Sequence, residues 1–304
     1  MTGTLPEELR ERALARVPGW AEATQPHACV PLSGGTSNAA YRVRTGAGDF
    51  VLRLHGAQSA LLGVNRENEL VLHEIAARAG IAPALVATDP AGEFLIAQYV
   101  PGSTWTAAHM ADPSCLAHLG RTLGELHALP VPTVAAYEPG RLLRVHAQRI
   151  AGLDGAGAAR LAPWLQQAER ILDRCARAGR RPAIIHNDLH HSNIVEAGRL
   201  YLIDWEYATV ADPVFDLACL LAYYPAAVKH AELLLDTAGL TRSALGALEE
   251  ATWLYVLLSY LWYRALALQS GPSAAAQAQE QALLQRLLDT RSSTAGAAAP
   301  RPAD

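Results

Sequence analysis

The stretch HNDLHHSN, residues 186–193, brings three histidines, one aspartate and two asparagines together between apolar segments. So polar a stretch fits a metal-binding cluster, a tight turn between strands, or a catalytic loop. The apolar segment LYLI follows it and leads directly into Asp204. A carboxylate at the end of a buried strand has to face a group that favours negative charge. A plain turn would explain the asparagines and the serine of the stretch, but it would not explain Asp204.

The spacing of three polar residues narrows this choice. Asp188 and Asn193 are five positions apart, and Asp204 lies 11 positions after Asn193. Phosphoryl transfer needs a carboxylate that positions the attacking hydroxyl, together with an asparagine and an aspartate that hold Mg²⁺ on the nucleotide phosphates. A histidine and an aspartate, then an asparagine, then a strand ending in an aspartate is the order found in kinase catalytic and metal-binding loops. The pattern therefore predicts a phosphoryl-transfer site that uses ATP and Mg²⁺.

Several segments together resemble one family of small-molecule kinases. YLIDWEYA and DPVFDLACL follow HNDLHHSN, and VLRLHG and NRENE precede it. This set resembles the aminoglycoside phosphotransferase and choline/ethanolamine kinase superfamily, and it is most similar to the bacterial choline kinase-like and thiamine kinase-like branches. The resemblance runs from about Leu32 to Tyr224. It implies an α+β, bilobal protein-kinase-like fold, with a small antiparallel β-sheet N-lobe and a mainly helical C-lobe.

The resemblance also implies roles for the residues of the central motif. Asp188 would be the catalytic base, and Asn193 and Asp204 would be the Mg²⁺ ligands. His186 would act as a scaffold residue that braces the catalytic loop. Asp216 would anchor the same loop through its backbone amides.

Arg53, in VLRLHG, would take the place of the lysine that holds the nucleotide phosphates in protein kinases. Its fixed charge and paired donors suit phosphate at least as well as an ammonium group does. The acidic partner of Arg53 is expected on the helix that follows. Glu69 is the first choice for this partner, and Glu67 and Glu74 are the alternatives.

Two features of the predicted site have an ordinary structural alternative. The loop SGGTSN would cover the nucleotide phosphates with backbone N–H groups of Ser33, Gly34, Gly35 and Thr36. A glycine pair is also common in a plain hairpin turn, and only its position before the Arg53 strand favours phosphate binding. His190 would either touch the transferred phosphoryl group or be hydrogen-bonded within its own loop.

The predicted acceptor is a small-molecule alcohol that carries positive charge, with choline or a related amino alcohol as the leading choice. Glu206 follows Asp204 by two positions and is predicted to face this acceptor. Trp253 belongs to an aromatic run that would bind a quaternary ammonium group or pack in the core. A thiamine kinase and an aminosugar or aminoglycoside phosphotransferase are the alternatives. LLAYY after DLAC lacks the acid that some choline kinases carry there, which leaves these alternatives open.

Two other classes of protein compete with the kinase interpretation. A nucleotide-binding pseudokinase would share the fold, but it would be favoured by the loss of Asp188, Asn193 or Asp204, and all three are present. A metal hydrolase would use the histidines of the stretch and Asp188 as ligands of zinc or of a dinuclear centre. Such a site usually needs further distant ligands, and it would not explain Arg53.

The order of expected elements divides the chain into two lobes. Alternating patterns predict strands at VPL, AAYRVR and DFVLRLHG, then a hairpin of ALVAT and EFLIAQYV, and later strands at PAIIH, NIVEAG and RLYLIDW. PGS at 101–103 indicates a hinge. Apolar spacing predicts helices over 65–79, 112–129, 142–153, 158–178, 212–224, 227–238, 241–269 and 273–288. We expect an N-terminal nucleotide-binding lobe over 1–102, a helical catalytic and substrate lobe over 103–290, and a disordered tail over 291–304.

Composition excludes several classes of partner and location. The net charge of -4 and the pI near 6.3 leave no broad basic surface for nucleic acid or for an anionic membrane. The most apolar segment, residues 251–263, is shorter than the roughly 20 residues that span a bilayer, so we expect a buried helix. The four cysteines form no CxxC pair, and the N-terminus lacks the pattern of a signal peptide. We expect a cytoplasmic protein, and the sequence leaves its oligomeric state open.

Overall fold

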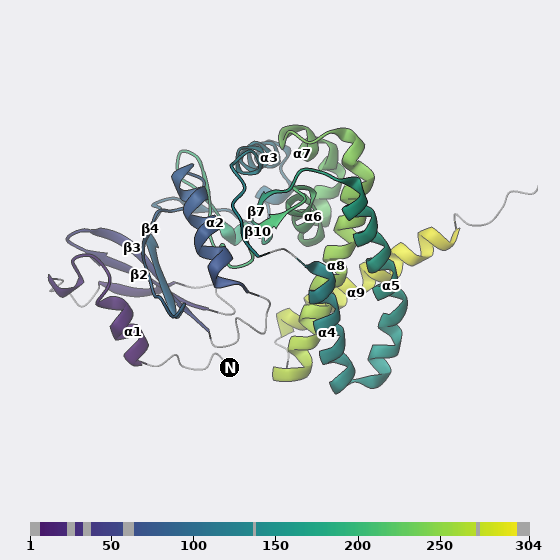
Figure 1. Cartoon of the computed structure of the whole chain (residues 1–304), viewed down its shortest axis with the longest axis horizontal. Helices are drawn as coiled ribbons and strands as arrows, with labels where there is room; N and C mark the ends of the chain where they lie inside the picture. Colours follow the sequence, from purple (N-terminus) through teal and green to yellow (C-terminus); the bar gives the residue numbers. More distant parts are fainter. Residues whose placement is uncertain are drawn as a thin grey trace, which may run out of the picture.

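An antiparallel sheet occupies one end of the molecule and a body of helices occupies the other (Figure 1). The computed structural model describes residues 7–22, 28–32, 38–56, 64–135, 138–271 and 274–296. The β-rich part comes first in the chain and the helical part second. This arrangement agrees with the predicted α+β class.

Five antiparallel strands form the sheet, in the order β1-β2-β3-β5-β4. The strands are β1 (Cys29–Leu32), β2 (Asn38–Thr45), β3 (Gly48–His55), β4 (Leu85–Thr88) and β5 (Phe94–Gln98). In this order β3 is the central strand. Arg53 lies opposite Ala40 of β2 and Leu95 of β5, so it is flanked by paired strands on both sides.

Alternation along β3 separates an apolar face from a polar one. Leu52 and Leu54 pack in a small core together with residues of α1 (Glu7–Leu14). Because successive side chains of a strand point to opposite faces, Arg53 projects from the other face of the sheet. Helix α2 (Arg66–Arg78) lies between the sheet and the helical body (Figure 1). The central strand thus presents Arg53 to α2 and to the second lobe.

The helical body is built around one large apolar core. Leu72 of α2 belongs to the same core, so this helix of the first lobe also packs against the second. The helices of the body are α3 (Pro113–His127), α4 (Pro139–Leu153), α5 (Gly155–Ala178), α6 (Val214–Tyr223), α7 (Ala231–Thr237), α8 (Leu245–Ser270) and α9 (Ala274–Gly296). Long α8 packs against α4, α5, α6 and α9, which makes it the central helix of the body.

Short strands hold the segments that carry the polar motif. β8 (Ile194–Glu196) pairs with β9 (Leu200–Leu202) as predicted, and also with β6 (Ser103–Thr104) at the expected hinge. β7 (Ala183–Ile185) pairs instead with β10 (Thr209–Ala211), a strand that the sequence did not predict. β10 is too short to show a period of two, and it lies outside the apolar runs that indicated β7, β8 and β9.

Helix boundaries differ from the prediction in the last third of the chain. The helix expected over 227–238 divides into a 3₁₀ segment, Pro225–His230, and α7. The apolar segment 251–263 lies within α8 and is largely buried, and no helix in the described ranges is long and apolar enough to cross a membrane. α9 continues to Gly296, and residues 297–304 of the predicted tail lie outside the described ranges.

Candidate active site

The polar stretch 186–193 forms the connection between β7 and β8, and its backbone is held by a carboxylate from α6. Asp216 accepts hydrogen bonds from the backbone N–H groups of His186 at 3.1 Å and of Asn187 at 2.8 Å. Its side chain is fully buried, and it also contacts Nε2 of His127 on α3 at 2.9 Å. Buried carboxylates are stable only when such donors surround them. α6 and α3 therefore fix the position of this loop.

His186 connects the loop to the segment that follows β9. Its Nε2 donates to the carbonyl oxygen of Ile203 at 2.9 Å, and its ring packs edge-on against Trp205 with 4.9 Å between the ring centres. Both rings are fully buried. Burial lowers the pKa of His186, which favours the neutral ring, and the hydrogen bond to Ile203 then places the ring proton on Nε2. His186 thus holds the loop against the residues around Asp204.

Asp188 and Asn193 face one another across the loop. Asn193 donates from Nδ2 to Oδ2 of Asp188 at 2.9 Å and to the Asp188 carbonyl at 3.0 Å. Desolvation, together with the negative charges of Asp204 and Glu206, raises the pKa of Asp188 to about 7. An acid whose pKa lies near neutrality is suited to accept a proton from a substrate.

Two residues of the site adopt the left-handed backbone conformation. Asn187 and Asp204 both have φ of 65°. Asparagine and aspartate are the side chains that tolerate this region best after glycine. Asn187 directly precedes Asp188, and Asp204 is itself a predicted site residue. Strained backbone of this kind is concentrated at functional sites.

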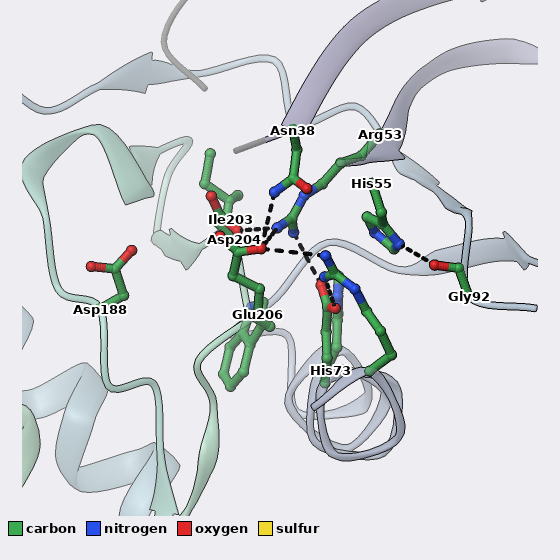
Figure 2. Close-up of polar contacts among 12 residues, drawn as sticks. Asn38, Arg53, His55, His73, Gly92, Asp188, Ile203, Asp204 and Glu206 are labelled. Atoms are coloured by element: carbon green, nitrogen blue, oxygen red, sulfur yellow. Dashed lines mark hydrogen bonds and ion pairs between the residues drawn. The ribbon is translucent and has the colours of Figure 1, made fainter. Parts of the chain in front are cut away.

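Arg53 lies at the centre of a buried group of carboxylates. Its guanidinium contacts Glu69 at 3.0 Å, Asp204 at 2.7 Å and Glu206 at 2.8 Å. Although burial disfavours the charged form, these three carboxylates raise the pKa of Arg53. Figure 2 shows the cluster around Arg53, with the side chain of Asp188 standing apart from it. The strand residue from the first lobe and the acid that follows β9 in the second lobe therefore meet directly.

Glu69 is the acid of α2 that pairs with Arg53, as the first choice from the sequence. Asn65 caps the helix by accepting from the backbone N–H groups of Glu67 and Asn68, which sets the first turn beside the sheet. Glu69 then lies fully buried one turn along α2. The alternative Glu67 is exposed.

Glu206 lies elsewhere than the sequence predicted. We expected it to face the acceptor, but its Oε2 lies 2.8 Å from Arg53, 3.5 Å from Arg66 and 3.0 Å from the side-chain amide of Asn38. The side chain is only 4% exposed. The left-handed turn at Asp204 redirects the chain, so the alternation of a strand no longer applies two residues later. Glu206 therefore belongs to the Arg53 cluster.

The oxygen donors beside this cluster fit Mg²⁺. Oδ1 of Asp204 is buried and accepts no hydrogen bond from the described residues, although the Arg53 guanidinium lies nearby. Asn193 directs its amide nitrogen at Asp188, so its amide oxygen is the atom that would contact a metal. Mg²⁺ usually takes one or two protein carboxylates together with substrate phosphates and water. Asp204 and Asn193 fit such a site.

The histidines of the stretch are not arranged as metal ligands. His190 packs against His191, and its side chain caps the 3₁₀ turn His191–Asn193 by accepting from the backbone N–H of Ser192. His191 contacts the hydroxyl of Tyr224 at 2.7 Å. In the described part of the chain, no group of three or more histidine, cysteine, aspartate or glutamate side chains could hold a metal ion. The metal-hydrolase alternative therefore has no ligand cluster to support it among these residues. His190 is engaged within its own loop, through Nδ1 and the Ser192 hydroxyl at 2.8 Å.

The aromatic side chains near Asp188 differ from the one that was predicted. Trp253 is buried in the main core, and no contact among the described residues joins it to Asp188. Burial raises the pKa values of Tyr223 and Tyr263, and the nearby charge of Asp188 raises both further. Both tyrosines are partly exposed. Tyr223 also packs edge-on against His190 of the same loop as Asp188, with 5.7 Å between the ring centres, which makes it an alternative to Trp253.

The glycine-rich loop cannot be placed beside these residues. Ser33, Gly34, Gly35 and Thr36 lie outside the described ranges, between β1 and β2. β2 begins at Asn38, whose amide contacts Glu206 in the Arg53 cluster. The end of this loop is thus joined to the cluster.

A family model described as the phosphotransferase enzyme family matches residues 28–251. This range includes both β3 with Arg53 and the loop with Asp188. The chain belongs to the phosphotransferase enzyme family. The predicted superfamily and the predicted enzyme class are thereby confirmed.

Among curated proteins, the phosphotransferase is similar to Protein LicA of Haemophilus influenzae, with 27% identity over 223 residues. The match covers 68% of this chain and 62% of LicA. The chain therefore matches less than two thirds of the length of this relative.

Solved structures share the fold at low sequence identity. A choline/ethanolamine kinase family protein from Mesorhizobium loti has a TM-score of 0.75 and 24% identity, and the match covers 92% of this chain and 94% of that one. Choline kinase LicA from Streptococcus pneumoniae has a TM-score of 0.68 and 20% identity, over 86% of this chain and 94% of that one. These matches confirm the predicted bilobal kinase-like fold.

Proposed function

We propose that this phosphotransferase transfers the γ-phosphoryl group of ATP to a hydroxyl group of choline or a related amino alcohol. One observation carries the proposal: the loop that holds Asp188 against Asn193 at 2.9 Å also packs its His190 ring against Tyr223, with 5.7 Å between the ring centres, while the next segment places Asp204 2.7 Å from Arg53. The loop of the proposed base is thus joined to an aromatic residue and is followed in the chain by an acid that contacts Arg53. This combination suits transfer from a nucleotide to an organic cation.

The nucleotide side of the proposal is supported by Arg53 and its partners. A guanidinium fork suits phosphate oxygens, and the ion pair with Glu69 sets its direction. Asp204 and Asn193 would hold Mg²⁺, which neutralises charge on the phosphates when it is bound. Solved structures of this fold include a complex of LicA with AMP and one of streptomycin, ATP and APH(2″)-IIa. We infer that ATP is the phosphoryl donor.

The chemistry assigned to Asp188 is to position the acceptor hydroxyl and to accept its proton. The transition state of phosphoryl transfer is loose, so positioning and charge stabilisation supply most of the rate. Asn193 fixes the Asp188 carboxylate by a hydrogen bond, and Asp216 fixes the start of the loop by accepting from the backbone N–H of His186. The raised pKa supports proton transfer near neutral pH.

The acceptor side is supported by partly exposed tyrosines rather than by an acid. A quaternary ammonium group binds to aromatic faces by cation–π attraction. Glu206, the nearest carboxylate after Asp204 in the sequence, is already paired with arginines. One neighbour of this fold is named choline kinase and another belongs to a choline/ethanolamine kinase family. These observations favour choline over an aminosugar, whose amines are usually matched by carboxylates.

An acceptor panel tests the proposal. Purified protein with ATP and Mg²⁺ is assayed for acceptor-dependent ADP release with choline, ethanolamine, thiamine and aminosugars, and Asp188→Ala serves as the inactive control. We expect choline or ethanolamine to have the highest kcat/KM, and we expect Asp188→Ala to bind nucleotide without turnover. Preference for thiamine or an aminosugar would replace the acceptor. Tight nucleotide binding with no turnover of any alcohol would indicate a pseudokinase.

A further inference from the structure

Glu206 is the point at which the two lobes meet through charge. It belongs to the segment between β9 and β10, yet three groups that contact its Oε2 come from the first lobe. Arg53 is on β3, Arg66 is on α2, and Asn38 is on β2. Figure 2 shows Asn38 and Arg53 converging on Glu206 from above. One buried carboxylate of the second lobe is therefore held by three elements of the first.

Arg66 completes a closed ring of charges with this contact. Arg53 pairs with Oε1 of Glu69, and Arg66 pairs with Oε2 of the same residue. Both arginines also reach Oε2 of Glu206. Two arginines and two glutamates thus alternate around a ring, and the glutamates are 0% and 4% exposed.

The ring gives Arg66 a role that Arg53 cannot fill alone. A buried carboxylate is strongly unfavourable once it loses its cationic partner. Arg53 also contacts Asp204, and in the proposed reaction it contacts the nucleotide phosphates as well. With Arg66 present, Glu69 and Glu206 each keep a second guanidinium while Arg53 serves the nucleotide. Arg66 itself is partly exposed, with 18% of its side chain accessible.

We propose that Arg66 is a positioning residue that acts through Glu206 to fix Arg53 of the first lobe against Asp204 of the second. The effect of this placement on ATP rests on the proposed function. The ring itself does not rest on it, because its contacts are made by the chain alone. Arg66 is no catalytic residue, since it acts through Glu69 and Glu206.

A double-mutant cycle with a matched control tests this role. The variants are Arg66→Met, Arg66→Lys, Glu206→Gln and the double variant Arg66→Met with Glu206→Gln. Arg78→Met is the control, because Arg78 also pairs with a glutamate of α2, Glu74, but is 76% exposed. Thermal unfolding without nucleotide is measured for each variant. Calorimetry then gives the affinity for ATP with Mg²⁺, and steady-state kinetics separates KM from kcat.

We expect Arg66→Met to lower Tm by about 6 °C or more and to weaken ATP binding roughly tenfold, with a smaller change in kcat. In the Glu206→Gln background the loss of Tm from Arg66→Met should fall to about half, because one charge that needs Arg66 is gone. Arg66→Lys should recover part of the affinity, and Arg78→Met should leave both measurements near wild type.

Additive losses in the cycle, or an Arg66→Met variant that behaves like Arg78→Met, would overturn the role of Arg66. If Arg66→Met does not fold, the same comparison is made with Arg66→Lys, for which affinity equal to that of the wild type contradicts the proposal. A wild-type protein that binds no ATP would instead refute the proposed function. The unfolding cycle would still decide whether the ring exists.

Discussion

The carboxylate of Asp216 on α6 accepts a hydrogen bond from the backbone N–H of His186 at 3.1 Å. The two residues are 30 positions apart in the chain, and both side chains are fully buried. A helix of the second lobe therefore sets the start of the loop that carries Asp188. A substitution of Asp216 should therefore affect the position of Asp188 through the backbone of the loop rather than through direct contact with substrate.

Asp216→Asn should lower both stability and activity. The substituted amide keeps one acceptor oxygen but directs an N–H₂ group at a backbone N–H, which leaves a buried donor unsatisfied. We expect a loss of about 3 kcal/mol in the free energy of unfolding and a fall in kcat of about tenfold or more. Urea unfolding and steady-state kinetics measure the two effects.

Asp236→Asn is the matched control for this substitution. Asp236 is also an aspartate of a helix, α7, and it pairs with Arg242, but its side chain is 43% exposed. An exposed ion pair contributes little to stability. Equal losses of unfolding free energy and of kcat in Asp216→Asn and Asp236→Asn would show that the loop does not depend on Asp216.

Asp188→Asn should abolish turnover and at the same time stabilise the metal-free protein. Desolvation and the carboxylates of Asp204 and Glu206 raise the pKa of Asp188 from 3.8 to about 7 in the folded state. The unfolded chain ionises more easily, so the stability of the wild type falls as pH rises from about 4 to about 7. Asparagine does not ionise, and it can still accept the hydrogen bond from Asn193.

The difference in the free energy of unfolding between Asp188→Asn and the wild type, measured by urea unfolding at several pH values, checks this sign. It should be small near pH 4.5, rise toward pH 7 and then level off at a gain of about 4 kcal/mol for the variant, because the pKa of Asp188 rises from 3.8 to about 7. Measurements are made with EDTA, because a bound cation would favour the ionised carboxylate. A difference that is constant with pH would contradict the raised pKa.

Removal of the metal should stop the reaction, and Asp204 should set the metal requirement. Excess EDTA is expected to abolish turnover, with recovery on addition of Mg²⁺. Asp204→Asn keeps the shape of the side chain but removes its charge, so the Mg²⁺ concentration for half-maximal rate should rise about tenfold or more. A Mg²⁺ titration at saturating ATP measures this shift. An unchanged titration curve would exclude Asp204 as a ligand.

Much of the site could be predicted because its residues lie on one short segment or are tied by helical spacing. His186, Asp188 and Asn193 share one loop, and the structure keeps them together. Glu69 could be selected from the acids of its helix. Arg66 was missed, although its position three residues before Glu69 is the spacing of a helical ion pair.

The rest of the site depends on contacts that leave no local pattern. β10 is three residues long, so its pairing with β7 has no periodic signal. Glu206 turns toward Arg53 because Asp204 adopts positive φ, and a sequence of the form DWE does not reveal that turn. Trp253 and Tyr263 stand on the same helix, and only its packing decides which is buried.

Tyr223 and Trp253 provide a test that separates the aromatic residue of the proposed acceptor site from the one expected from the sequence. Tyr223→Leu should raise the KM for choline about five- to thirtyfold, because the ring that attracts the cation is lost. Tyr223→Phe should change it little. With the neutral alcohol in which carbon replaces the choline nitrogen, the wild type, Tyr223→Leu and Tyr223→Phe should have similar KM values.

Trp253→Leu should instead lower the free energy of unfolding by about 3 kcal/mol through the cavity it leaves, with the choline KM unchanged. A choline KM that responds to Trp253→Leu and not to Tyr223→Leu would return the acceptor site to Trp253.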